Sequence, residues 1–407
     1  GESALGSQNF TTATDTFNIA VGHRAGSQIT TGVQNTFVGS EAGDGTDDGS
    51  FNVAVGYLAL SANCGSNNTA VGHRSLLATT GDLNTSVGKE AGTTLSSGQR
   101  CTFVGALAGN SASTMEDSVA IGNDAGKFAT TAHSSVFIGA DAGQGITGTK
   151  LTGTQNVCVG AQAGFLLQGA ANGNTYVGFG AGKANTTASN NTALGQNAGA
   201  ALTTGSRNIF IGEETGLATV AVNTGVDNIA IGYQARLSAV DGGNQIVMGK
   251  QVNCTGNSNF TFGAGATDSN IGFGETSISA PSDERYKEDI ATSTAGLSFI
   301  KDLRPVTFKW KKAKDVPVGH DAYIADGEEG CNDRVMLSNG ETNHGFIAQE
   351  VKAAIDNHSE LKDGFGMWTV DEQDTTNGRQ RLADGALVPM LVKAIQELEA
   401  RIATLEG

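Results

Sequence analysis

Proline and tryptophan are almost absent from this chain of 407 residues. The four prolines and two tryptophans all lie at or beyond position 281: Pro281, Pro305, Pro317, Pro389, Trp310 and Trp368. Because proline removes a donor from a β-ladder, its absence from residues 1–280 favours continuous strand pairing there. The chain therefore consists of two different kinds of polypeptide, which meet at Pro281.

Cysteine is also scarce. Five cysteines occur singly, at positions 64, 101, 158, 254 and 331, without any C-x-x-C pair. This odd count disfavours a disulfide framework or a metal site, so we expect no metal, no cofactor and a reducing folding compartment. No window approaches the ~20 apolar residues of a membrane span, and no secretory segment opens the chain. Its first residues, Gly1-Glu2-Ser3, resemble the edge of a fragment.

Basic residues are in the minority. The chain has 25 Lys and Arg against 41 Asp and Glu, a formal net charge of −16. An acidic chain has no long-range attraction for a phosphate backbone. We therefore expect neither a nucleic-acid partner nor insertion into a membrane.

Glycine, by contrast, is abundant and recurs in a repeated phrase. Its first clear copy is Asn18-Ile19-Ala20-Val21-Gly22-His23-Arg24-Ala25-Gly26. An aliphatic residue precedes every anchoring glycine, and Asn stands four places before it in ten of the fourteen copies. The anchors lie 16 to 18 residues apart, with two longer steps before Gly160 and Gly232: Gly22, Gly39, Gly56, Gly72, Gly88, Gly105, Gly122, Gly139, Gly160, Gly178, Gly195, Gly212, Gly232 and Gly249.

Each copy offers one short strand, which cannot bury a face by itself. Stacked copies give every strand a hydrogen-bonding neighbour and align the aliphatic positions in a column. Glycine permits the tight corners of so short a coil, and we expect the asparagines to form a ladder between coils. The repeat thus predicts a mainly β fold, with a parallel β-solenoid of about 14 coils over residues 1–250. Residues 251–280 break the period and are expected to form a cap or neck.

A single coil of this size encloses little core, so an isolated solenoid would expose much of its small apolar surface. We expect the alanine of the G-x-x-A-G phrase to pack against a neighbouring chain, and three parallel chains to associate. The phrase resembles the head repeats of trimeric autotransporter adhesins and similar repeats in phage tail fibres. That resemblance implies a homotrimeric parallel β-roll.

Longer loops interrupt the repeat at residues 144–154, 166–173 and 219–226. Insertions in a solenoid map to one face, which is often the binding face. We therefore expect these loops to contact a host cell-surface receptor, for which a glycan is the favoured class.

Residues 281–407 have the composition of a mixed α+β domain. Four sequence motifs occur there in a recognisable order: S-D-x-R-x-K at 282–287, then 303–310, 345–351 and 391–398. Together they resemble the C-terminal intramolecular chaperone domain of phage endosialidases, tail fibres and neck appendages, also found in a membrane-bound transcription factor family. The resemblance implies that residues 281–407 direct trimer assembly and then cleave themselves off.

Ser282 and Lys287 are the candidate catalytic residues. A serine hydroxyl is a poor nucleophile until a base takes its proton, and lysine can be that base where desolvation or nearby cations lower its pKa. Five residues separate the two, so a turn can bring them together. The alternative is a plain helix N-terminus, with Ser282 as its cap and acidic residues in the first turn.

By resemblance, Ser282 attacks the backbone next to it, Lys287 serves as general base, and the bond between Pro281 and Ser282 is cut. Asp283 and Arg285 would support the site. The only enzymatic activity expected is therefore a single-turnover serine–lysine autoproteolysis.

The end of the chain carries apolar residues in a 3-4-3-4-3 spacing: Val388, Leu391, Ile395, Leu398, Ile402 and Leu405. This pattern predicts a short coiled-coil helix that sets the register of three chains. Pro389 lies near its start, where a helix tolerates proline.

Two functions fit these features. The first is a trimeric viral (phage) tail fibre or tailspike protein with a host-attachment role, assembled in the host cytoplasm and located in the virion tail. The alternative is a bacterial trimeric surface adhesin, which a signal peptide or anchor upstream of residue 1 would favour. A depolymerase of surface glycans ranks below both, because the repeat contains no aromatic-rich catalytic insert.

Overall fold

The computed structural model describes residues 1–9, 14–216, 224–239, 241–320, 322–335, 340–361, 365–370 and 379–406. Residues 219–223 of the third expected contact loop lie outside these described residues. The chain forms two compact units, Gly1–Ser282 and Asp283–Gly407. Each unit is described by itself.

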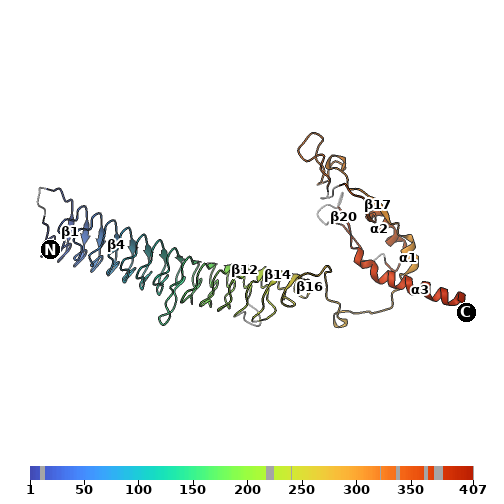
Figure 1. Cartoon of the computed structure of the whole chain (residues 1–407), viewed down its shortest axis with the longest axis horizontal. Helices are drawn as coiled ribbons and strands as arrows, with labels where there is room; N and C mark the ends of the chain where they lie inside the picture. The colour runs from blue at the N-terminus through green and yellow to red at the C-terminus, as the bar shows by residue number, and fades with distance from the viewer. Residues whose placement is uncertain are drawn as a thin grey trace. The chain divides into compact units, whose positions relative to one another are not determined.

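The first unit is built on one sheet of 16 strands that follow one another in sequence order (Figure 1). β14 and β15 are parallel, like the pairs before them, and β15 and β16 are antiparallel. The strands are β1 Ile19–Val21, β2 Thr36–Val38, β3 Val53–Val55, β4 Thr69–Val71, β5 Thr85–Val87, β6 Thr102–Val104, β7 Val119–Ile121, β8 Val136–Ile138, β9 Val157–Val159, β10 Thr175–Val177, β11 Thr192–Leu194, β12 Ile209–Ile211, β13 Ile229–Ile231, β14 Gln245–Lys250, β15 Asn259–Ala264 and β16 Thr267–Gly272. The expected mainly β fold with a parallel solenoid of about 14 turns is confirmed.

Buried asparagines connect successive coils. The backbone N–H of Asn35 donates to Asn18 Oδ1 at 2.8 Å, and Asn52 donates in the same way to Asn35 Oδ1 at 2.8 Å. Asn35 Nδ2 in turn donates to the carbonyl of Gly49 at 2.9 Å. The column continues through Cys101, whose N–H donates to Asn84 Oδ1 at 3.0 Å. The expected asparagine ladder is therefore confirmed, and it supplies partners for polar groups that the narrow coil buries.

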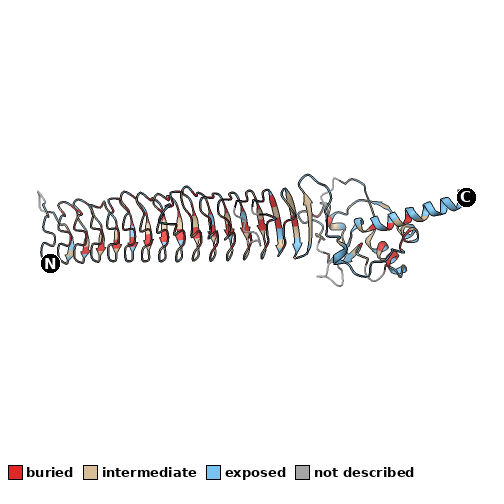
Figure 2. Cartoon of the chain, turned by 90° about the horizontal axis from the view of Figure 1, so that it is seen from below, coloured by how far each residue is buried: buried red, intermediate tan, exposed pale blue. Residues whose placement is uncertain are grey.

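The middle residue of each strand points into the coil, and Figure 2 shows these positions as a buried column. Five coils place an aromatic ring there, and all five rings are at most 1% exposed: Phe37, Phe103, Phe137, Tyr176 and Phe210. Glycines lie against each ring; a Cβ added to Gly43 would lie 2.6 Å from Phe37 and one added to Gly109 would lie 2.4 Å from Phe103. Where the neighbouring middle residues are small, as at Ala54 and Ala70, the position that Gly43 occupies in its coil is taken by a buried leucine, Leu60. Large and small residues thus alternate between two facing columns, which keeps the core filled.

The alanines of the G-x-x-A-G phrase also point inward. Ala25, Ala42 and Ala91 are 0% exposed and belong to the core of their own solenoid. The expectation that these alanines pack against a neighbouring chain is therefore wrong. The turn after each anchoring glycine folds back over the strand, so the alanine methyl group faces the middle column.

The second unit contains short helices and two antiparallel strand pairs, β17 with β18 and β19 with β20. Its core is formed chiefly by Phe299, Val351, Ile355, Met367 and Met390. The elements are η1 Glu284–Tyr286, α1 Leu297–Asp302, β17 Val306–Phe308, η2 Ala313–Asp315, β18 Asn343–Gly345, α2 Ala348–Asn357, β19 Trp368–Val370, β20 Gln380–Leu382, η3 Asp384–Leu387 and α3 Val388–Glu406. The expected small α+β region ending in a helix is confirmed.

All five cysteines are free and buried. Burial raises the pKa of the Cys64 and Cys101 thiols to about 11. Among the described residues, no helix is long and apolar enough to cross a membrane. No group of three or more His, Cys, Asp or Glu in the same part of the chain is placed to hold a metal ion.

Candidate self-cleavage site and assembly helix

A single turn of 3-10 helix, η1, follows the proposed cleavage point. Asp283 caps it, because its carboxylate accepts the backbone N–H of Arg285 at 2.9 Å. Lys287 ends it in an extended conformation, with its N–H donating to the carbonyl of Glu284 at 3.0 Å. The cap is thus Asp283, whereas the alternative interpretation of the sequence assigned that role to Ser282. Both residue types are good caps. Asp283 is favoured here because its carboxylate also pairs with the side chain of Arg285.

Asp283 and Arg285 are the two predicted supporting residues that the structure brings together. The guanidinium of Arg285 donates from Nε to Asp283 Oδ1 at 3.0 Å and forms an ion pair with Oδ2 at 2.5 Å. These bonds hold the pKa of Asp283 below its ordinary value. The pair is solvent-exposed, so it orders the turn locally and adds little to global stability.

Ser282 and Lys287 are both exposed, like most of the segment around them. Ser282 is the last residue of the first unit, and Lys287 belongs to the second. Both take part in interactions. The pairing of Ser282 with Lys287 stays a prediction, as does cleavage of the bond between Pro281 and Ser282.

Two large apolar side chains near the site face solvent. Tyr286 is 77% exposed and Ile290 is 66% exposed. Such residues gain nothing from exposure, and burying an apolar side chain of this size stabilises by about 1.5–3 kcal/mol. The segment 283–290 therefore offers apolar surface for further packing.

A cluster of charged groups beyond the site went unnoticed in the sequence. His358 Nε2 lies 2.9 Å from Asp302 Oδ2, and His358 Nδ1 lies 3.2 Å from Glu360. The imidazole also packs edge-on against Phe299, with ring centroids 5.4 Å apart. The hydrogen bond with Asp302 is the main reason that the pKa of His358 is raised. An isolated histidine gave no signal for this cluster, because Asp302 is 56 residues away in sequence.

A second ion pair lies near the start of α2. Arg304 donates from Nε to Glu350 at 2.9 Å, which joins the two predicted segments 303–310 and 345–351. β17 lies in the first segment and pairs with β18, whose last residue, Gly345, begins the second; α2 begins three residues after β18 ends. Two of the four motifs that carried the resemblance are therefore adjacent in the fold.

The helix α3 has two faces. Met390 and Ala394 are buried against the core of the unit, and Glu397 accepts the backbone N–H of Leu297 at 2.9 Å, which attaches α3 to α1. The other face is exposed (Figure 2). It carries the five predicted trimerisation residues, which are 43–86% exposed: Leu391, Ile395, Leu398, Ile402 and Leu405.

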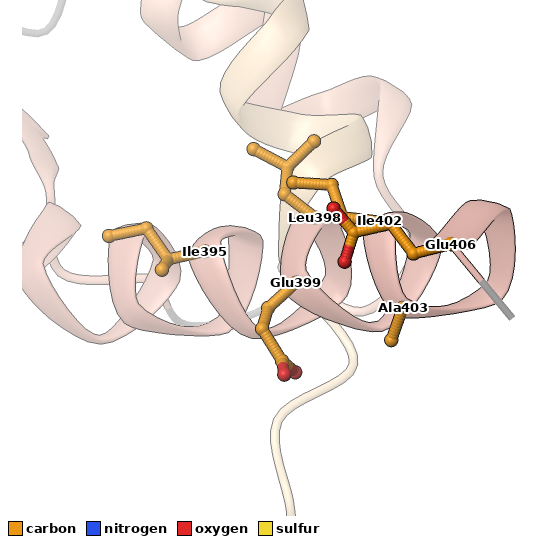
Figure 3. A pocket seen from close by; sticks show the side chains of 6 residues that line it. All are labelled: Ile395, Leu398, Glu399, Ile402, Ala403 and Glu406. Atoms are coloured by element: carbon orange, nitrogen blue, oxygen red, sulfur yellow. The ribbon is translucent and has the colours of Figure 1, made fainter.

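The exposed face of α3 forms an open apolar hollow (Figure 3). Ile395, Leu398 and Ile402 line it together with Glu399, Ala403 and Glu406. Spacings of three and four residues put Ile395, Leu398 and Ile402 on one side of the helix. A single chain thus presents an exposed a/d-type stripe, as a coiled-coil strand would.

Comparison with known families gives one match. Residues 282–360 match the model of the family described as chaperone of endosialidase. The match begins at Ser282, the residue at which the two compact units meet. Searches of curated proteins and of solved structures give no match.

Proposed function

We propose that this chain is a homotrimeric viral tail fibre or tailspike protein with a self-releasing C-terminal chaperone. Residues 1–250 form the shaft, and residues 281–407 bring three chains together and start their folding. The chaperone then separates from the shaft by cleavage before Ser282. The observation that carries this proposal is the family match starting at Ser282, which follows a solenoid sheet whose last strand, β16, ends at Gly272.

The cleavage step uses only groups in the segment 281–287. Lys287 takes the proton of the Ser282 hydroxyl, and Oγ attacks the carbonyl carbon of Pro281. The amide bond breaks as the ester forms, and the proton passes to the new α-amine of Ser282. Water then hydrolyses the ester, which leaves a carboxylate at Pro281 and restores the serine hydroxyl. The step consumes one water and needs no cofactor.

Mass spectrometry of freshly purified full-length protein tests this step. Wild type is expected to give a C-terminal fragment that starts at Ser282, whereas Ser282→Ala and Lys287→Ala give only the intact chain. Glu288→Gln is the matched control, because Glu288 is an exposed neighbour of Lys287 without a role in the mechanism. A single intact mass in folded wild-type trimer contradicts autocleavage, and a fragment that persists in Ser282→Ala contradicts the assigned nucleophile.

The location proposed for the assembled protein is the virion tail, after assembly in the host cytoplasm. Its proposed partner is a host cell-surface receptor, with a glycan as the favoured class. Residues 146–150, in the first of the longer loops, are the contact segment to test, since four of these five residues are exposed. A bacterial surface adhesin with the same parts is the alternative, and immunolocalisation on virions and on bacterial cells separates the two.

A further inference from the structure

The strands of the solenoid present an outer face that no part of the first unit's core covers. In each three-residue strand the middle side chain is directed inward, so the first and third are directed outward. Consecutive strands pair without offset at these positions: Ile19 with Thr36, then Thr36 with Val53. The outward residues therefore form two straight columns along the sheet, which we call the strand face.

The strand face carries no charge. Its first column contains only Thr, Val and Ile, and its third-position column contains only Val, Ile, Leu and Met, from Val21 to Met248. Several of these aliphatic side chains are more than a third exposed, among them Val21 at 57%, Leu194 at 47% and Met248 at 42%. The whole chain has 66 charged residues, yet none falls on these 28 positions, which are two in each of β1–β13 together with Ile246 and Met248 of β14. In a sheet with one face exposed to water, the outward positions would carry polar residues instead.

The two columns continue into the last three strands with larger apolar groups. Ile246 pairs with Phe260, and Phe260 with Ile271; Met248 pairs with Phe262. The rings of Phe260 and Phe262 lie 5.1 Å apart, centroid to centroid. The strand face is therefore an uncharged strip that extends through the end of the repeat. At about 4.8 Å per coil it spans about 60 Å, far longer than an isolated surface patch on a monomer.

The spacing of the strip selects its occupant. Its ridges repeat once per coil, so a partner can match it from end to end only with the same repeat. A second copy of this chain, parallel and in register, has the same repeat because its sequence is identical. Charge at the borders agrees with this partner. In coil 12 of the described sheet, the residues two places before and two places after the strand are both charged, with opposite signs: Arg207 and Glu213. Arg207 also forms an ion pair with Asp227 of its own chain at 2.6 Å.

We propose that the strand face is the surface through which the shafts of three chains pack around a common axis. This inference rests on the homotrimer proposed above and names its contact surface. In a cyclic arrangement the start of each strand lies against the end of the same strand in the next chain. That geometry brings Glu213 of one copy toward the Arg207–Asp227 ion pair of another. The uncharged columns then form a core between chains, in addition to the core within each coil.

Cysteine cross-linking of the full-length protein tests the strand face. Thr102→Cys places a thiol on the outer side of β6, and Thr192→Cys does the same on β11. Thr114→Cys is the matched control, because Thr114 is exposed in the same coil as β6 but outside the strand. The native cysteines are buried, so a short bis-maleimide reagent meets little background.

Covalent dimers and trimers are expected to account for most of the chain in Thr102→Cys and Thr192→Cys, with only background cross-linking in Thr114→Cys. Sedimentation of the same samples without the reagent reports the oligomeric state independently. A trimer in which neither strand-face cysteine cross-links, or in which Thr114→Cys cross-links equally well, overturns the strand face and leaves the proposed function intact. A monomeric full-length chain overturns both.

Discussion

At the scale of single residues, the aromatic rings of the middle column decide where glycine is required. Phe103 lies between Gly92 and Gly109, and an added Cβ would come within 2.7 Å of the ring at the first and 2.4 Å at the second. In two coils whose own middle residue and the next are both small, leucine takes the place of this glycine, at Leu60 and Leu76. Some glycines of the repeat are thus required because an aromatic ring of the middle column packs against them.

Gly109→Ala is therefore expected to destabilise the shaft. The backbone there has a φ of +57°, which costs an L-residue about 1 kcal/mol, and overpacking against Phe103 adds about 1–3 kcal/mol. Chemical denaturation of the variant measures the loss. Gly148→Ala is the control, because an added Cβ there meets nothing within 4 Å. An unchanged midpoint for Gly109→Ala contradicts the packing rule, and a smaller loss from Gly109→Ala in a Phe103→Ala background than in wild type supports it.

The cluster at His358 predicts a dependence of stability on pH. The pKa of His358 is raised by Asp302, so its stabilising contribution is fully present below the ordinary value of ~6.5 and is lost as pH rises through the folded value. The difference in thermal midpoint between wild type and His358→Gln should be largest near pH ~5.5 and shrink above neutral pH. The exposed histidine variant His344→Gln is the control. A difference that grows with pH contradicts the assignment.

At the scale of elements, the helix α3 has one face buried in its own unit and one apolar face exposed to solvent. Met390 and Ala394 hold it to its own unit, whereas Ile395 and Ile402 remain exposed at 64% and 53%. A helix used only as the end of a monomeric domain would carry polar residues on its free face. The apolar stripe is consistent with a role between chains.

Ile395→Asp is expected to abolish trimer formation. The substitution places a charge at the centre of the apolar stripe, where a coiled coil would bury it without a partner. Gln396→Asp introduces the same charge on the next, also exposed, residue and serves as the control. Light scattering coupled to size-exclusion chromatography distinguishes the outcomes. Should Ile395→Asp still elute as a trimer, α3 is not the assembly helix.

Some elements could be predicted from the sequence because they depend only on residues that are close together in the chain or repeat at a fixed spacing. A Cβ at Gly22 would lie 2.3 Å from the carbonyl oxygen of Gly39, and φ there is +141°. No other residue fits this corner, so the anchoring glycines count the coils directly. The coiled-coil spacing of α3 is local in the same sense, since one helix face can be recognised from its period.

Other features depend on contacts that sequence spacing does not encode. The direction of Ala25 was predicted wrongly, because the fold-back of its turn is a property of the stacked coils. The cap at Asp283 was a choice between two adjacent capping residues, and the Arg285 side chain favoured one of them. The bonds from His358 to Asp302 and from Glu397 to Leu297 span 56 and 100 residues. Such pairs become visible only in the folded chain.

At the scale of the whole molecule, a long parallel solenoid has a register problem. Its coils are nearly identical, so a slip by one coil preserves most contacts within and between chains. Non-local strand pairing is also slow to form. In the proposed function, the C-terminal domain aligns the chains before the shaft folds, which removes both difficulties, and cleavage afterwards removes the template from the folded product.

The last expectation concerns refolding. Uncleaved Ser282→Ala protein, unfolded in guanidinium and diluted, should recover trimer in good yield, because the chaperone is still attached. The shaft that ends at Pro281, purified after cleavage and treated identically, should recover several-fold less trimer and give aggregates instead. Sedimentation and far-UV circular dichroism measure both yields. Adding the separated C-terminal fragment back is the control, since it lacks the covalent link that aligns the chains. Equal recovery by the shaft alone would mean that residues 1–281 contain their own register signal, and the chaperone would then be needed for speed rather than for alignment.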